Sequence, residues 1–302
     1  SMTSAPLPRW LGVALLLTIA ATFASNHVAA RLAFDHGANV ATAVAVRSAG
    51  TALFVLALLR HGGVAPRMPL PTLGRAVAIG LLVSIQSLCL YSAVARIPVA
   101  LALLAFNTFP LLLGLISWAA GGERPSRRAF VAMPIALAGL ALALDVAGLA
   151  RPPAGDASAP ASMATGVAFA LGAAASFASA LYLTTRWLGT TDGRLRTLVL
   201  MLVVAGVAIA GGALGGSFHW PRDAIGWGAL AALTVLYGSA ITALFVLLPR
   251  LGAVNNAAVL NFEPIAALLL GWVVLDQQVA PIQIGGAMVV IGAIVMLTTG
   301  RR

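Results

Sequence analysis

Lysine is absent from the 302-residue sequence, so arginine supplies all 18 of its strongly basic side chains. Charged residues of both signs make up only 9% of the chain, whereas hydrophobic residues make up 61%. Soluble domains carry about 25% charged residues, so this composition excludes an ordinary soluble protein. The length allows about ten spans of roughly 20 residues with short loops. The sequence therefore predicts an all-α integral membrane protein embedded in a lipid bilayer.

Other absences narrow the function. Cys89 is the single cysteine and allows no internal disulfide. The phosphate-binding pattern Gly-x-x-x-x-Gly-Lys-Ser/Thr is absent, which disfavours an ATP-driven pump. An intramembrane enzyme, the alternative from a different class, is disfavoured because His-Glu-x-x-His is absent and only four histidines occur. We expect no enzymatic activity, no cofactor and no metal. The net charge of +10 would suggest nucleic acid in a soluble protein, but here we expect it to set membrane orientation.

Ten apolar runs follow one another along the chain. The expected spans are residues 10–33, 39–59, 72–95, 98–120, 128–148, 164–187, 195–215, 224–248, 254–275 and 282–299. The first run is too long for the apolar region of a signal peptide, so we interpret it as a span. The most polar connector, residues 149–163, is expected to be a flexible linker between residues 1–148 and 164–302.

The two halves repeat each other with an offset of 154 residues. Ala20-Ala21-Thr22-Phe23-Ala24-Ser25 returns as Ala174-Ala175-Ser176-Phe177-Ala178-Ser179. The same offset joins three pairs of less common residues: Asn107 with Asn261, Pro110 with Pro264, and Trp118 with Trp272. The chain is therefore expected to be a duplicated five-helix unit. Five is an odd number, so the second repeat must be inverted relative to the first.

The arginines predict the orientation of these repeats. With ten spans, 13 arginines fall on the side that holds both termini and four on the other, and Arg47 lies within the second span. Because positive residues favour the cytoplasmic side, both termini are expected in the cytoplasm.

At this point the sequence resembles the EamA-type branch of the drug/metabolite transporter superfamily. The resemblance rests on the two five-helix repeats, Pro110, Glu263-Pro264, and the acids in Gly122-Glu123-Arg124-Pro125 and Leu275-Asp276. Within this branch the chain is most similar to bacterial exporters of aromatic and other amino acids. The resemblance implies a multi-pass inner-membrane exporter with a central cavity between the repeats. We expect it to function as a monomer.

Two prolines interrupt equivalent spans. Pro110 and Pro264 have no amide hydrogen, so each frees a helical carbonyl that needs another partner. Broken helices of this kind form binding sites in transporters, although a tolerated kink is the simpler interpretation. We expect the prolines to be hinges, and Asn107 and Asn261 to line the cavity.

Glu263 is the acid furthest from any loop. Burying its charge in an apolar span would cost about 2.5–3.5 kcal/mol, so it must be paired, hydrated or protonated. One interpretation is a buried ion pair with Arg47. The other is a role in the cavity, in which Glu263 binds an ammonium group or carries a proton.

The remaining cavity candidates are polar or aromatic residues within spans. They are Asn26, His27, Gln86, Tyr91, Tyr182 and Tyr237. A lone histidine near a span end, such as His27, is more often interfacial than a ligand, and the tyrosines could equally belong to an interfacial belt. The predicted function is secondary transport by alternating access. Because Arg47 is the only deep basic residue, small zwitterions fit better than phosphorylated substrates. Amino-acid export is the first hypothesis, and export of lipophilic cations or drugs is the second.

Overall fold

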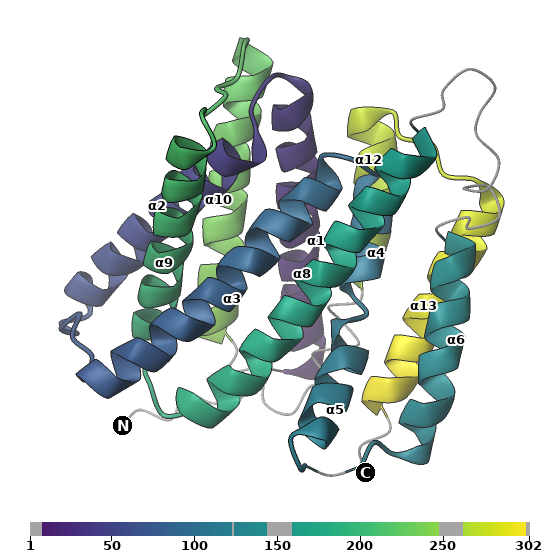
Figure 1. Ribbon diagram of the computed structural model, residues 1–302, viewed down its shortest axis with the longest axis horizontal. Helices are drawn as coiled ribbons and strands as arrows, with labels where there is room; N and C mark the ends of the chain where they lie inside the picture. The colour runs from purple at the N-terminus through teal and green to yellow at the C-terminus, as the bar shows by residue number, and fades with distance from the viewer. Residues whose placement is uncertain (1–7, 123, 144–158, 248–261, 300–302) are drawn as a thin grey trace.

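The computed structural model describes residues 8–122, 124–143, 159–247 and 262–299 (Figure 1). All regular structure in these ranges is helical. The first repeat contains α1 (Arg9–Asp35), α2 (Val40–His61), α3 (Leu70–Val94), α4 (Val99–Phe106), α5 (Phe109–Ala119) and α6 (Arg127–Ala143). The second contains α8 (Ala159–Trp187), α9 (Gly193–Leu214), α10 (Ala224–Leu247), α12 (Phe262–Leu275) and α13 (Pro281–Thr299).

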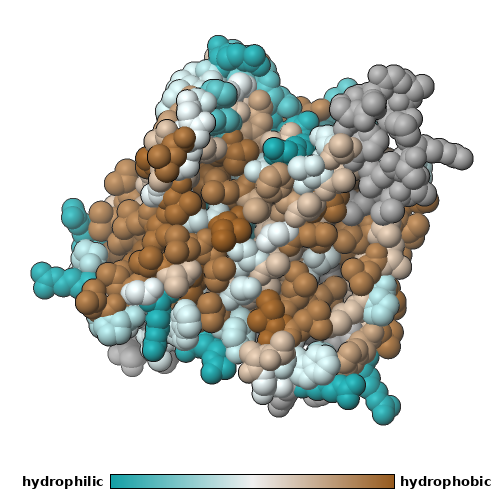
Figure 2. Space-filling view, viewed as in Figure 1, coloured by the Kyte–Doolittle hydropathy of each residue, from teal (hydrophilic) through white to brown (hydrophobic). Residues whose placement is uncertain are grey.

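The predicted all-α membrane architecture is confirmed. Seven segments are long and apolar enough to cross a membrane, with α4 and α5 counted as one. The apolar helices within α6, α12 and α13 are shorter, so the expected number of ten spans stays a prediction. Hydrophobic side chains cover the middle of the molecule, and hydrophilic ones gather towards its two ends (Figure 2). This distribution matches a bilayer core between two aqueous faces.

One expected boundary changes. The linker was expected to extend to residue 163, but α8 already begins at Ala159. Pro160 favours this start, because proline fits the first turn of a helix, where its missing amide hydrogen costs nothing. Residues 144–158, which contain the rest of the linker, and residues 123 and 261 lie outside the described ranges.

The helices pack as an inverted pair of repeats. In the numbering offset of 154, α1, α2 and α3 correspond to α8, α9 and α10. The structure packs α1 against α10 and α3 against α8. Replacing each helix by its counterpart in the other repeat turns the first of these contacts into the second. The contact of α1 with α12 exchanges in the same way with the contact of α8 with α5. Two further contacts, α2 with α9 and α6 with α13, each join a helix to its own counterpart in the other repeat. Both contacts therefore lie on the pseudo-twofold axis.

Loop contacts show directly that the repeats are inverted. The connector after α1 meets the connector after α9, not the equivalent connector after α8. The backbone N–H of Asn39 donates to the His219 carbonyl at 3.2 Å, and the backbone N–H of Arg222 donates to the His36 carbonyl at 2.9 Å. His36 Nδ1 also lies 2.7 Å from Asp223 Oδ2. These contacts join one end of the first repeat to the opposite end of the second.

The fourth span is broken where the sequence predicts it. Between α4 and α5, Asn107 and Thr108 form a turn, and Pro110 lies at the start of α5. Asn107 Nδ2 donates to the carbonyl of Leu103 at 2.6 Å, and Thr108 Oγ1 donates to that of Ala105 at 2.7 Å. The break is therefore stabilised by side chains of its own turn, as a buried, lipid-embedded backbone requires.

Small residues bring α6 and α13 into backbone contact. A Cβ atom at Gly286 would overlap the backbone nitrogen of Ala143 and come 2.6 Å from the carbonyl oxygen of Gly139. In Figure 1 these two helices run side by side along one edge of the molecule. Glycine is required here by packing, since membrane helices approach most closely through small residues.

Candidate functional site

A connected group of polar and aromatic side chains lies between α1, α2, α3, α10 and α12. We call it the Tyr91 cluster, and its members are Asn26, His27, Arg47, Ser87, Tyr91, Tyr237 and Glu263. Every member except Tyr237 and Glu263 is buried. The cluster draws residues from both repeats.

Tyr91, on α3, connects most of the cluster. Its hydroxyl donates to Asn26 Oδ1 at 2.7 Å. The His27 ring meets the Tyr91 ring edge to face, with centroids 5.8 Å apart, and Phe34 makes a similar contact at 5.9 Å. Tyr91 therefore fixes the C-terminal half of α1 against α3.

Glu263 occupies the first turn of α12, where the N-terminal end of the helix favours a negative charge. Its Oε1 lies 3.4 Å from His27 Nε2, and the two side chains are 14% and 7% exposed. This contact follows from the packing of α12 on α1. Glu263 is thus the cluster's only acid, and it keeps some access to the surroundings.

Arg47 reaches from α2 into the space between α3 and α10. Its guanidinium carbon lies 4.8 Å from the centroid of the Tyr91 ring and 4.0 Å from that of the Tyr237 ring. Arg47 Nη2 donates to Ser87 Oγ at 2.9 Å, and Ser87 donates in turn to Gln86 Oε1 at 3.2 Å. The expected contact between Arg47 and Glu263 is not formed: Glu263 faces His27, and the described residues place no carboxylate within 4.0 Å of Arg47.

Other predicted site residues lie elsewhere. Asn107 was expected to line the cavity, but its amide is bonded to its own helix. Tyr182 accepts a hydrogen bond from Arg186 Nη1 at 2.9 Å on α8, and its ring also faces that guanidinium, away from the members of the cluster. Asn261 falls outside the described residues. His27 was left open as an interfacial residue, yet it is buried because α1 continues eight residues further, to Asp35.

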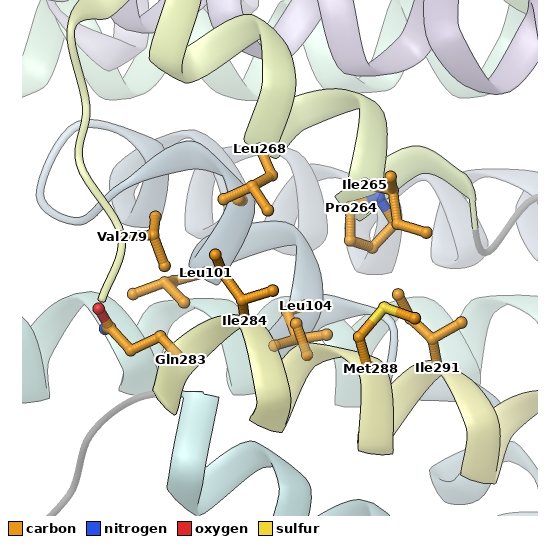
Figure 3. A pocket seen from close by; sticks show the side chains of 12 residues that line it. Leu101, Leu104, Pro264, Ile265, Leu268, Val279, Gln283, Ile284, Met288 and Ile291 are labelled. Carbon is orange, nitrogen blue, oxygen red and sulfur yellow. The ribbon is translucent and has the colours of Figure 1, made fainter. Parts of the chain in front are cut away.

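Pro264 borders a separate apolar cavity. The cavity has a volume of about 170 Å³ and lies between α4, α12 and α13 (Figure 3). Its lining residues are Ala100, Leu101, Leu104, Pro264, Ile265, Leu268, Val279, Gln283, Ile284, Ala287, Met288 and Ile291. Gln283 is the only polar side chain among them. The cavity offers free volume beside the predicted hinge but no group that would recognise a polar substrate.

The repeat symmetry does not extend to the chemistry of the Tyr91 cluster. The offset of 154 pairs Asn26 with Ala180, His27 with Leu181, Arg47 with Met201, and Glu263 with Phe109. Around Phe109 the structure gathers three aromatic rings, with centroids 4.9 Å apart for Phe109 and Phe177 and 5.4 Å apart for Phe106 and Phe177. One side of the pseudo-twofold axis is therefore polar and the other aromatic.

Comparison with known proteins agrees with this architecture. The EamA-like transporter family matches the chain twice, at residues 10–144 and 164–299. The chain belongs to the EamA-like transporter family. This membership fits the drug/metabolite transporter superfamily and identifies the chain as a membrane transporter of small molecules.

The transporter also has the fold of a solved structure titled "Crystal structure of protein". The two chains are 19% identical and superpose with a TM-score of 0.64, and the match covers 96% of each. At this identity the likeness establishes the fold alone. The comparison with curated proteins found no match.

Sequence reasoning missed the partners that orient the charged groups. Ser87 positions Arg47, and Phe23 packs edge to face on Tyr237, with ring centroids 6.2 Å apart. Neither residue carries a signal of its own in an apolar span. Only the packing of α2, α3 and α10 gives them a function.

Proposed function

We propose that this transporter exports amino acids with neutral or aromatic side chains by alternating access through a central cavity between its repeats. The observation that carries the proposal is Glu263, a partly accessible carboxylate beside His27 in the Tyr91 cluster within the membrane interior. Such a carboxylate binds an ammonium group or a proton. Arg47 supplies a positive charge in the same cluster, so both charges of a zwitterion have a complement.

Export of lipophilic cations is the second candidate, because Glu263 and the surrounding aromatic rings would also suit a cation. The buried charge of Arg47 speaks against it, since a fixed cation in a medium of low dielectric constant repels another. An intramembrane enzyme is disfavoured by the family, whose members are transporters.

The proposed location is the cytoplasmic, or inner, membrane, with both termini in the cytoplasm. The distribution of arginines over the connectors supports this orientation. Residues 1–148 and 164–302 would be the two units that move relative to each other.

Reconstitution of the purified chain into liposomes tests the function. We expect uptake of radiolabelled neutral or aromatic amino acids, and little uptake of cationic dyes. Transport of the dyes alone would favour the second candidate, and transport of neither class would refute both.

A pH gradient across the liposomes separates proton exchange through Glu263 from facilitated diffusion. If Glu263 carries the proton, Glu263→Gln should abolish the response to the gradient while the protein remains folded. The matched control is Asp276→Asn, the same chemical change at the other end of α12. Asp276 is exposed, and its φ of 52° suits asparagine. Persistence of the pH response in Glu263→Gln would exclude this residue as the proton carrier.

A further inference from the structure

Arg47 is the most deeply buried charged group of the Tyr91 cluster. Its side chain enters from α2, and the residue is only 3% exposed. At a rise of 1.5 Å per residue, it lies about 10 Å along the helix from Val40. Two tyrosine rings flank the guanidinium, and the acceptors beside it are neutral hydroxyls, those of Ser87 and Tyr91. A cation in this position needs more than neutral acceptors to offset its loss of hydration.

Two buried donors of the cluster have no acceptor. Arg47 Nε and Asn26 Nδ2 are both buried and have no hydrogen-bond partner. His27 Nδ1 is also buried and unpartnered. Among the described residues the carboxylate of this cluster is that of Glu263, and it faces the other nitrogen of His27. Buried donors without partners are unfavourable, so the arrangement lacks an acceptor, and the charge on Arg47 indicates an anionic one.

We propose that Arg47 binds the carboxylate of the transported molecule. This rests on the proposed function, and it assigns the two ends of one zwitterion to Arg47 and Glu263. A guanidinium presents its N–H groups as a planar fork that matches the two oxygens of a carboxylate. Ser87 occupies Nη2 and leaves Nε free for the incoming oxygen. Asn26 Nδ2 supplies a second, uncharged donor.

Access to this site requires one tyrosine ring to move. Tyr91 is fully buried, and its hydroxyl is bonded to Asn26. Tyr237 is only half-buried, and its hydroxyl has a weak thioether acceptor, Met201 Sδ, at 3.8 Å. Tyr237 is therefore the ring that swings aside, and Tyr91 remains as the fixed wall.

Three probes with the same phenyl side chain test the assignment. L-Phenylalanine carries both charges, phenethylamine carries only the ammonium, and 3-phenylpropionate carries only the carboxylate. In competition assays on reconstituted wild-type protein, we expect phenylalanine to bind about 10- to 100-fold more tightly than phenethylamine, as one charge-assisted contact predicts. In Arg47→Gln this preference should disappear through weaker binding of phenylalanine. Arg47→Lys should retain part of it.

The matched control is Arg96→Gln. Arg96 also lies over an aromatic ring, 4.8 Å from the centroid of Phe169, but it is exposed and outside the cluster. We expect this variant to keep the wild-type preference. An unchanged ratio of phenylalanine to phenethylamine binding in Arg47→Gln would overturn the assignment and show that Arg47 acts in packing alone.

The wild-type protein provides a test that needs no substitution at Arg47. Phenylalanine amide lacks the carboxylate and should bind about tenfold or more weakly than phenylalanine; equal binding would refute the inference. Replacing chloride by gluconate should leave transport unchanged, whereas strict chloride dependence would assign Arg47 to a free anion instead. If wild type carries no amino acid at all, the proposed function fails as well. If it carries amino acids and amides equally, only the inference about Arg47 fails.

Discussion

The contact between His27 and Glu263 makes a quantitative prediction. At 3.4 Å, a protonated His27 and an ionised Glu263 would attract by about 5 kcal/mol at an effective dielectric constant of about 20. Desolvation offsets much of this attraction, but removing one partner from a buried pair leaves the other charge uncompensated, at a cost of about 3–5 kcal/mol. Both side chains are largely buried, so we expect His27→Leu to destabilise the protein by about 3 kcal/mol.

The choice of leucine comes from the chain itself. Leu181 occupies the equivalent position of α8, so the fold accommodates leucine at this point of a repeat. The loss in His27→Leu would therefore report the unpaired carboxylate and not a poor fit. Adding Glu263→Gln removes that carboxylate, and we expect the double variant to be more stable than His27→Leu alone.

Thermal unfolding of the purified variants in detergent measures this coupling. A loss of about 3 kcal/mol corresponds to a fall of about 5–10 °C in the melting temperature. If the effects of the two single substitutions on stability add to within about 0.5 kcal/mol in the double variant, His27 and Glu263 do not interact and the reasoning is wrong.

Three further predictions concern the scaffold. Gly286→Leu should separate α6 from α13 and cost about 1–3 kcal/mol of stability by overpacking, measured as a lower melting temperature. Gly285→Leu is the control: a Cβ at Gly285 would meet open space, so the melting temperature should change little. The N–H of Gly226 and the ring of His36 hold the pKa of Asp223 below its usual range. The contribution of Asp223 to stability is therefore present above a pH of about 4 and is lost as the pH falls further. Melting curves of Asp223→Asn should differ from those of the wild type at neutral pH and converge with them in acid. Replacing both Pro110 and Pro264 by alanine should slow transport in liposomes while the protein stays folded, and unchanged transport would rule out hinges at these prolines.

The architecture was readable from the sequence because it depends on patterns that repeat. Apolar runs separated by breakers predict helices, and an odd number of them in each half predicts inversion. Pro110 and Asn107 predict the break in the fourth span, and the structure contains it at that point. These features need no knowledge of which helix touches which.

The partners within the site depend on helix packing, which the sequence leaves open. Glu263 was assigned Arg47 as a possible partner because Arg47 is the only other deep charge. The structure instead packs α12 on α1, which brings His27 to the carboxylate, while Arg47 meets rings from α3 and α10. Asn107 was assigned to the cavity because it precedes Pro110 by three residues, as Asn261 precedes Pro264, but the structure bonds its amide to a carbonyl of its own helix.

The one-sided chemistry of the Tyr91 cluster has an energetic consequence for a carrier with inverted repeats. If such a carrier works by letting its repeats exchange shapes, two identical repeats would give inward-open and outward-open states of equal free energy. Here the described residues join the first and third helices through a buried hydrogen bond only in the first repeat, from Tyr91 to Asn26, because Ala180 has no side-chain acceptor at the matching position. This bond removes the degeneracy. The empty carrier should rest mainly in one orientation, and the substrate must supply the difference in free energy to reach the other.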